Sequence, residues 1–532
     1  MTKKSYLVGV DLGTAGTKAA IFDEDGNLLA SAYEESRLFY PRPGWVEQEL
    51  DDFYRSACKT IREVIQKSKV SPQNVAGIAF DGQMAGIGGI DKNWKPVTRY
   101  DSWLDTRCEP YIDLMKKKAE DLVIKKTGSP PSYNHGPKII WWMREAPETF
   151  KKIHKFVMPA GYVAGKMVNL KGDDAFIDYT YIHFSGFSDT KNATWHEELC
   201  GIFGVPLEKL PRIVSPWEIV GKLSPEAARD TNLVSGIPVA AGAGDQTAGF
   251  LGAGFVEKGE LIDVAGTASC FAGCVDRFIP DVKTKTFLCF HSVVPELWYL
   301  LAYINGGGLC LRWFRDQFAR EEKEKANKSG KDPYEILNDF AERVPPGSEG
   351  LLFVPHLGGR VCPYNPYVKG TWFGFSWKHG KYHFYRALLE GIAYEYDYYF
   401  SILRQLFPDL PFKKVRVIGG GARSNLWNRI KANVLNLSYF RVNREELAVL
   451  GSAIIAGYAV GLFSDLASTS KRFTAVAGLP VNPDLSLHNY YKNFSRLYLE
   501  LLSSQEKISR QLTRINQLSI PAWSINEEKV NE

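Results

Sequence analysis

Three glycine-rich loops, each directly after an apolar stretch that predicts a strand, are the segments of this chain best suited to chemistry. They span residues 13–17, 266–269 and 419–425. Glycine lets the main chain approach a ligand closely and adopt left-handed conformations at little cost, so backbone N–H groups in such loops can surround phosphate oxygens. A single Gly-Thr turn is usually only a hairpin. Three loops together predict a site that encloses one triphosphate.

The first two loops belong to a long-range repeat. Asp11-Leu-Gly-Thr14 in the first half has a counterpart in Asp263-Val-Ala-Gly-Thr267 in the second half. A repeat at this spacing predicts two related lobes with facing hairpins rather than a solenoid of short repeats. The chain has no GxxxxGK[ST] loop and no HRD and DFG pair, and its first glycine loop opens a strand where a Rossmann fingerprint opens a helix. These three nucleotide-binding classes are therefore excluded.

Asp245 is the candidate for proton transfer. It stands between Gly244 and Gln246, just after a predicted strand at 237–241 and near the midpoint of the chain, where a hinge between lobes would fall. Phosphoryl transfer needs an attacking hydroxyl that is aligned and gives up its proton, and a carboxylate within reach of both lobes can accept it. The alternative is an Asx-turn residue without a chemical role.

Length and composition limit the class of protein. A chain of 532 residues exceeds one ordinary domain, and 45% hydrophobic with 23% charged residues is typical of a globular protein. The net charge is only +5 and the basic residues are scattered, which argues against a nucleic-acid partner. No apolar run is long enough to span a membrane, and the eight cysteines form no CxxC pair. We therefore expect a cytoplasmic protein with reduced thiols and no membrane partner.

The elements expected around the loops alternate between strands and helices, which predicts an α/β protein. Strands are predicted at 6–10, 18–22, 28–33, 75–80, 237–241 and 414–418. Helices are predicted at 51–68, over much of 110–165, from about 426 onward and at 448–462.

These motifs resemble the FGGY carbohydrate kinases, which belong to the actin/hexokinase/heat-shock-chaperone superfamily. The two hairpins, Gly244-Asp-Gln246 and the segment 419–425 carry the resemblance, in the expected order over residues 5–500. Segments 370–390 and 133–145 are similar to the two family signatures. The departures from those signatures, His135, Trp142 and Phe375, affect packing more than chemistry.

The resemblance implies a two-lobed actin/hexokinase-like (ribonuclease H-like) ATPase fold with a central cleft. It implies transfer of the γ-phosphate of ATP to a hydroxyl of a small sugar, with ATP and Mg²⁺ as cofactors, and it allows a homodimer. We expect residues 1–254 to form the lobe with the sugar site and first phosphate loop. Residues 255–515 would carry the second phosphate loop and the adenosine loop, followed by a loosely ordered tail, 516–532.

The resemblance also assigns roles to single residues. Asp245 is the expected catalytic base, and Asp11 and Asp245 are the expected Mg²⁺ ligands. The expected sugar contacts are Gln83, Met84, Trp103, Asp105, Asp245 and Gln246. The expected nucleotide contacts are Gly13, Thr14, Thr17, Gly266, Thr267, Gly308, Gly421, Ala422 and Asn425. For Asp105 an ion pair with Arg107, two residues on, is the alternative to a sugar contact.

Several substrates stay open at this stage. Segments 82–84, 102–107 and 419–424 are most similar to xylulokinases, which favours a ketopentose such as xylulose, but Ala85 stands where xylulokinases have a histidine. Segments 313–316 and 343–347 are closer to glycerol kinases and autoinducer-2 kinases. Glycerol, erythritol, gluconate and autoinducer-2 are therefore the alternative substrates. The alternatives of another class are an actin-like or chaperone-like ATPase that phosphorylates nothing, and a degenerate paralogue that acts as a regulator.

Overall fold

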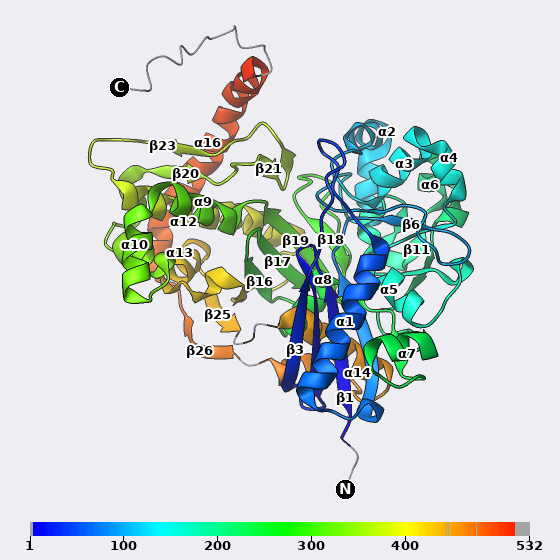
Figure 1. Ribbon diagram of the computed structural model, residues 1–532. Helices are drawn as coiled ribbons and strands as arrows, with labels where there is room; N and C mark the ends of the chain where they lie inside the picture. Colours follow the sequence, from blue (N-terminus) through cyan, green and yellow to red (C-terminus); the bar gives the residue numbers. More distant parts are fainter. Residues whose placement is uncertain (1–3, 443, 445, 475, 517–532) are drawn as a thin grey trace, which may run out of the picture.

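The computed structural model describes residues 4–442, 444, 446–474 and 476–516, and it consists of two lobes, each built on its own seven-stranded sheet (Figure 1). Of the tail predicted at 516–532, residues 517–532 lie outside the described residues. All eight cysteines are free, as expected for reduced thiols. None of the described helices is long and apolar enough to cross a membrane.

The first sheet carries the first glycine loop. Its strands are β1 (Tyr6–Leu12), β2 (Gly16–Asp23), β3 (Leu28–Glu35), β5 (Val75–Gly82), β13 (Ile219–Lys222), β14 (Pro238–Ala240) and β15 (Ala243–Gly244). Their order is β13-β14-β5-β1-β2-β3, with β15 also paired to β5. Strands β1, β2 and β3 form an antiparallel meander, whereas β5 runs parallel to β1. The predicted hairpin at 13–17 is therefore the turn between β1 and β2.

The second sheet repeats this arrangement. Its strands are β16 (Leu261–Ala265), β17 (Ser269–Val275), β18 (Leu288–His291), β19 (Trp298–Ile304), β24 (Lys414–Ile418), β25 (Ser438–Val442) and β26 (Val476–Val481). Their order is β18-β19-β17-β16-β24-β25-β26. Strands β16 and β17 form an antiparallel hairpin, and β24 runs parallel to β16. Each half of the chain thus has a hairpin whose first strand also pairs with a parallel neighbour.

Helices cover both sheets. Those of the first half are α1 (Leu50–Ser68), α2 (Glu109–Thr127), α3 (His135–Glu145), α4 (Pro147–Lys152), α5 (Pro159–Met167), α6 (Glu197–Phe203), α7 (Pro225–Thr231) and α8 (Asp245–Gly252). Those of the second half are α9 (Gly307–Phe318), α10 (Arg320–Ser329), α11 (Pro333–Ala341), α12 (Lys381–Leu406), α13 (Asn425–Leu435), α14 (Leu447–Ala459), α15 (Leu466–Phe473) and α16 (Leu485–Asn516). Helix α1 begins within one residue of its predicted start.

Short strands tie the connecting segments to one another. They are β4 (Glu47–Gln48), β6 (Gly88–Ile90), β7 (Tyr100–Asp101), β8 (Lys155–Val157), β9 (Phe176–Asp178), β10 (Ser188–Asp189), β11 (Thr194–Trp195), β12 (Arg212–Val214), β20 (Leu352–Val354), β21 (Arg360–Val361), β22 (Tyr364–Asn365) and β23 (Thr371–Phe373). The pairs are β4 with β7, β6 with β8, β9 with β12, β10 with β11, β20 with β23 and β21 with β22.

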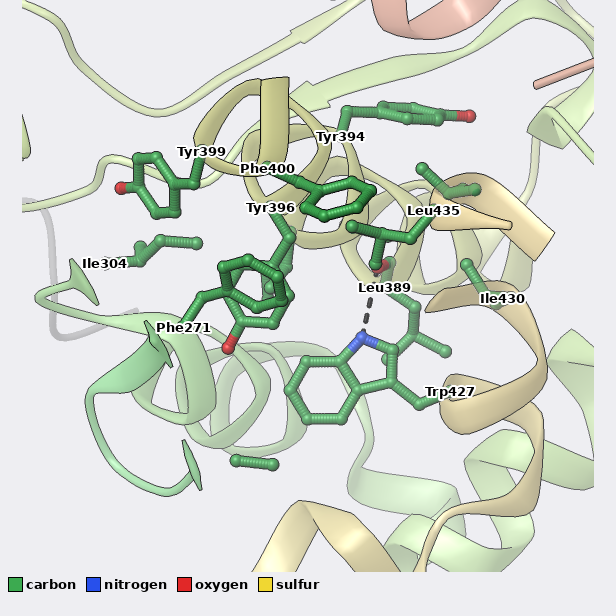
Figure 2. Packing of buried hydrophobic residues seen from close by; sticks show 14 of the residues in the cluster. Phe271, Ile304, Leu389, Tyr394, Tyr396, Tyr399, Phe400, Trp427, Ile430 and Leu435 are labelled. Carbon is green, nitrogen blue, oxygen red and sulfur yellow. Dashed lines mark hydrogen bonds between the residues drawn. The ribbon is translucent and has the colours of Figure 1, made fainter. Parts of the chain in front are cut away.

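The C-terminal lobe has a core rich in aromatic side chains. Trp427 of α13 is buried in it, and its indole Nε1 donates a hydrogen bond to the carbonyl of Leu389 over 3.1 Å (Figure 2). A buried indole N–H needs such a partner, because an unmade hydrogen bond in an apolar core is costly. This bond joins α13, which follows the third glycine loop, to the long helix α12.

Helix α14 comes from the second half of the chain but packs on the first sheet and on α8. The segment 255–515, expected to form the C-terminal lobe, thus also contributes a helix that packs against the first sheet. The approach is close, because a Cβ added at Gly9 of β1 would lie 1.9 Å from the Val449 carbonyl oxygen. A Cβ at Gly451 would likewise lie 1.9 Å from the Ala248 oxygen. Glycine at both positions lets α14 reach the site described below.

Candidate active site

Asp245 lies between two cavities. It is the first residue of α8 and follows β15, whose residues Ala243 and Gly244 pair with the end of β5. One cavity, of about 300 Å³, is lined by Asp11, Lys18, Asp245 and Gln246 among others. A second cavity, of about 570 Å³, has Asp245 and Gln246 in its wall as well. The carboxylate of Asp245, which was predicted to reach both lobes, thus lines both cavities.

Three carboxyl groups interact electrostatically beside the first cavity, and two of them, Asp11 and Asp245, line it. Asp11 and Asp81 are partners in the parallel register of β1 and β5, and Asp245 is close enough for its charge to act on Asp81. Burial raises the pKa of Asp11 to about 6, and burial together with the charge of Asp11 raises the pKa of Asp245 to about 7. Burial and the charge of Asp11 also raise the pKa of Asp81 well above its usual range. Such shifted carboxyl groups in a cavity are typical of catalytic sites.

Two of these carboxyl groups have an oxygen that lacks a partner. Asp11 Oδ1 and Asp81 Oδ1 are buried and have no hydrogen-bond donor other than each other's carboxyl group within the described part of the chain, whereas Asp81 Oδ2 accepts a hydrogen bond from Ser452 Oγ of α14 over 2.6 Å. A buried, unpartnered carboxylate oxygen fits a bound cation. Among the described residues no group of three or more ligating side chains forms a metal cage. Mg²⁺ does not need one, because it binds through one or two carboxylates plus water and phosphate oxygens.

The sequence reasoning missed Lys18, Glu446 and Asp81. Lys18 lies opposite Asp11 in the register of β1 and β2, and its Nζ is 3.0 Å from Glu446 Oε2 in the same cavity. Strand periodicity could have identified Lys18, because Lys18 and Asp11 are directly opposed and so face the same side. Glu446 and Asp81 carried no such signal, since only the packing of α14 and β5 brings them here.

Thr17 was predicted to contact phosphate, and the structure contradicts this. Its side chain is buried, and its Oγ1 shares a hydrogen bond with Ser56 Oγ of α1 over 2.7 Å. Thr17 and Lys18 are neighbours in a strand and therefore point to opposite faces. Because Lys18 faces the cavity, Thr17 faces the helix. Gly13 lies in the hairpin turn, where its N–H donates to the Gly16 carbonyl over 3.0 Å.

The larger cavity collects most of the predicted sugar contacts. Those that line it are Gln83, Met84, Trp103, Asp245 and Gln246. Further lining residues, which the sequence did not indicate for this cavity, include Ala268, Cys270, Glu109, Asn134, His183 and Arg360. Trp103 is 42% exposed, so its ring is a surface of the cavity rather than part of the core. An apolar ring beside several amide groups suits a polyol, which presents both C–H and O–H surface.

A chain of hydrogen bonds joins the first hairpin to this cavity. Trp103 Nε1 donates to Thr14 Oγ1 over 2.8 Å, and Thr14 Oγ1 donates to Gln83 Oε1 over 3.2 Å. Gln83 Nε2 in turn donates to Gln48 Oε1 over 2.7 Å. Thr14 was predicted as a phosphate contact; its hydroxyl instead holds two residues of the sugar cavity.

Asp105 was predicted to contact the sugar, and the structure contradicts this. Its carboxylate is fully buried, accepts hydrogen bonds from Arg107 Nε and Nη2 and from the Val46 N–H, and does not line the cavity. Arg107 lies 3.7 Å from the centre of the Trp45 ring. With all of these partners, the Asp105 carboxylate has no oxygen left for a ligand. Asp105 therefore forms a buried ion pair with Arg107.

A third cavity, of about 520 Å³, is bordered by the second and third glycine loops. The predicted nucleotide contacts that line it are Gly266, Thr267, Gly308 and Gly421. The Gly308 N–H donates to the Gly266 carbonyl over 3.1 Å, and a Cβ at Gly308 would lie only 2.1 Å from that oxygen. Glycine is therefore required where α9 begins against the hairpin.

Two predicted nucleotide contacts lie elsewhere. Ala422 is buried in the C-terminal core, and Asn425 is exposed at the first turn of α13; neither lines the third cavity. The local reason is the cap of α13, where Ser424 Oγ accepts a hydrogen bond from the Trp427 N–H. This cap turns Ser424, rather than Asn425, toward the cavity.

Comparison with known proteins agrees with this geometry. Residues 6–252 match the N-terminal domain, and residues 263–460 the C-terminal domain, of the FGGY family of carbohydrate kinases. The gluconokinase of Bacillus subtilis is 31% identical over 89% of this chain and 92% of its own length. A xylulose kinase of Staphylococcus epidermidis is 27% identical over 96% of this chain and 99% of its own length.

The fold has close counterparts among solved structures. The crystal structure of xylulose kinase from Rhodospirillum rubrum superposes with a TM-score of 0.85 at 22% identity, covering 95% of this chain and 100% of that one. The two-lobed actin/hexokinase-like fold expected from the sequence is thereby confirmed. With both halves matched in order and a relative above 30% identity, the chain belongs to the FGGY family of carbohydrate kinases, which are ATP-dependent sugar kinases.

Proposed function

We propose that this enzyme transfers the γ-phosphate of ATP to a hydroxyl of a neutral ketose, of which xylulose is the first choice. Asp245 would act as the general base. The observation that supports this most strongly is the place of Asp245 in the walls of both the cavity with Asp11 and the cavity with Trp103. A carboxylate at that boundary can contact an acceptor hydroxyl and still lie beside the phosphate to be transferred.

The reaction needs one proton transfer. As the sugar oxygen bonds to the γ-phosphorus, the bond between that phosphorus and the β,γ-bridging oxygen breaks, and ADP leaves with the bond's electron pair. The hydroxyl proton passes to Asp245, whose pKa of about 7 suits a base that works near neutral pH. The Gln246 N–H donates to Asp245 Oδ1 over 2.6 Å, which orients the carboxylate.

The phosphate chain would lie between the two hairpins. Gly266 and Thr267 would approach it with backbone N–H groups, and Lys18 would offer a positive charge from the other lobe. Asp11 and Asp245 would hold Mg²⁺, which when bound supplies charge neutralisation on the phosphate oxygens. The unpartnered Oδ1 of Asp11 supports this assignment.

The charges of the larger cavity favour a neutral substrate. Arg360 is the one lysine or arginine among its lining residues in the described part of the chain, and that guanidinium is paired with buried Glu395 at 2.8 Å. Glu109, which is exposed and lines the same cavity, adds a negative charge. An aldonate would therefore meet no uncompensated cation. Gluconate is nevertheless the second candidate, because the Bacillus subtilis relative is a gluconokinase.

A substrate panel tests the proposal. D-Xylulose, other ketopentoses, glycerol, erythritol and D-gluconate would each be offered with ATP and Mg²⁺, and ADP release would be measured. We expect the highest kcat/KM with a ketopentose. A preference for gluconate would overturn the neutral-substrate proposal, and ATP hydrolysis indifferent to every carbohydrate would favour a chaperone-like ATPase.

Substitution of the base is the matching test of mechanism. Asp245→Asn keeps the shape of the side chain but removes its ability to accept the proton, so kcat should fall about 100- to 10,000-fold. Circular dichroism and thermal unfolding would verify that the variant is folded. Near-normal turnover in a folded Asp245→Asn enzyme would remove Asp245 from this role.

A further inference from the structure

We propose that Glu395, which does not line the sugar cavity, sets whether that cavity accepts a neutral or an anionic sugar. The inference rests on the proposed function of the larger cavity as the acceptor site. Glu395 acts through Arg360 and is therefore a positioning residue rather than a catalytic one. Its test below separates a failure of this inference from a failure of the proposed substrate.

Arg360 and Glu395 form a close ion pair, and only Arg360 reaches the cavity. Arg360 Nε donates to Glu395 Oε1 over 2.9 Å, and Arg360 Nη2 lies 2.8 Å from Glu395. Glu395 on α12 is completely buried, whereas Arg360 on β21 keeps about a tenth of its side chain exposed and lines the cavity. The cation therefore borders the substrate space, and its counter-charge lies behind it.

The negative charge on Glu395 is itself held in place by its surroundings. Tyr498 of α16 donates a hydrogen bond to Glu395 Oε2 over 2.6 Å, and His356 Nε2 lies 3.5 Å from the same oxygen. Burial acts against ionisation, but the charge of Arg360 and these partners lower the pKa of Glu395 to about 2. Glu395 is thus ionised at neutral pH, and the charges of Arg360 and Glu395 cancel.

This neutrality has a consequence for specificity. A carboxylate in the cavity would be attracted to Arg360 and repelled by Glu395 behind it, so the pair offers an anion little net attraction. A neutral sugar is affected far less, because it carries no net charge for either group to act on. Removing the charge of Glu395 would leave Arg360 as an uncompensated cation beside the substrate space. Affinity for an aldonate should then rise while affinity for a neutral ketose changes little.

The decisive variant is Glu395→Gln. Arg360 and Tyr498 donate to different oxygens of Glu395. The amide oxygen of glutamine can keep the bond from Arg360, and its NH2 group can donate to the Tyr498 hydroxyl, so the change removes the charge and keeps the shape of the side chain. A hydrogen bond to a charged group contributes enough to predict a shift of about tenfold or more in aldonate affinity. Because the new attraction is electrostatic, the shift should shrink as NaCl concentration rises.

Helix α12 supplies a matched control. Glu390 is also buried and paired with an arginine, since Arg386 Nε donates to Glu390 Oε1 over 2.9 Å. Glu390 Oε1 likewise accepts a hydrogen bond from a tyrosine of α16, Tyr491, over 2.9 Å. Neither Arg386 nor Glu390 lines the sugar cavity. Glu390→Gln therefore repeats the loss of one buried charge on the same helix without touching the charge balance of the cavity.

The experiment compares the full-length enzyme, Glu395→Gln and Glu390→Gln. For each protein we would measure the KM for D-xylulose, and the inhibition constant of D-gluconate against D-xylulose, at low and high NaCl. We expect the ratio of the two constants to shift toward gluconate by about tenfold in Glu395→Gln, mostly at low salt, and to stay unchanged in Glu390→Gln. An unchanged ratio in Glu395→Gln, or an equal shift in both variants, would overturn the inference.

A second variant reverses the charge imbalance. Because removing either partner of a buried pair is strongly destabilising, thermal unfolding would verify that both variants are folded. Arg360→Gln leaves Glu395 as the uncompensated charge, so gluconate inhibition should weaken, which is the opposite sign. No change in the ratio for Arg360→Gln would also contradict the inference. If the unaltered enzyme itself prefers gluconate, the proposed substrate is wrong, but the direction of the two shifts still decides the role of Glu395.

Discussion

The two glycine hairpins look alike in sequence but hold their aspartates in opposite environments. Asp11 of β1 lines the cavity beside Asp245, whereas Asp263 of β16 is buried in the core of the C-terminal lobe. There the carboxylate of Asp263 forms an ion pair with buried Lys431 and accepts a hydrogen bond from Tyr396 over 2.9 Å. One aspartate is therefore available to a ligand, and the other is fully engaged within the protein.

The difference arises because the number of residues between the aspartate and the hairpin glycine is even in one hairpin and odd in the other. Asp11 lies two residues before the first hairpin's Gly13, while Asp263 lies three residues before Gly266. Successive side chains of a strand point to opposite faces, so the two aspartates must face opposite ways when the turns are superposed. The residue of the second hairpin that matches Asp11 is Val264, and Val264 does line the same cavity as Asp11. Spacing decides the role here more than residue type does.

The largest expected effect is on stability, at the second hairpin. Asp263→Asn would leave the buried ammonium of Lys431 without a counter-charge, and breaking a buried ion pair costs about 3–5 kcal/mol. Urea unfolding should therefore show a large loss in the free energy of unfolding, while the folded fraction keeps its activity. Asp11→Asn, measured in parallel, should leave the free energy of unfolding nearly unchanged. Equal destabilisation of both variants would contradict the comparison.

The next effect is on the metal and on turnover, at the first hairpin. Asp11→Asn should weaken Mg²⁺ binding, so that half-maximal turnover needs a higher Mg²⁺ concentration. It should also lower kcat/KM for ATP about 10- to 100-fold, the usual scale for altered metal-site residues. Steady-state rates over a range of Mg²⁺ concentrations would measure this change. The folded fraction of Asp263→Asn is the control, and its Mg²⁺ dependence should match the unaltered enzyme. If the concentration dependence on Mg²⁺ stays the same in Asp11→Asn, Asp11 does not contact the ion.

The smallest effect is a shift of the pH profile. A base must be ionised to accept a proton, so kcat/KM should fall about tenfold per pH unit below the pKa of Asp245, about 7. Because the charge of Asp11 raises that pKa, Asp11→Asn should move the acid limb to lower pH. Asp263→Asn should leave the limb where it is. An acid limb that moves upward, or does not move, in Asp11→Asn would show that the two carboxyl groups do not interact.

Much of the fold and part of the site could be predicted from local patterns. The strand 414–418 and the helix at 51–68 were expected almost at their observed bounds, because buried strands and amphipathic helices have strong periodic signals. Five of the expected sugar contacts line one cavity. The predictions for Thr17 and Asp105 failed for the same reason. Both are polar residues close in sequence to residues that line the cavities, but their own side chains point into the protein and bond there.

Local sequence patterns locate the glycine-rich loops, the carboxylate near the midpoint of the chain and the plan that both halves repeat. These features depend on backbone conformation and on spacing within a single segment, which local chemistry controls. The packing of distant segments is what brings Asp81 and Glu446 beside Asp245 and Asp11 and places Glu395 behind Arg360. Those groups come from segments far apart in the chain, and the burial that sets their charge exists only once the lobes and α14 have packed.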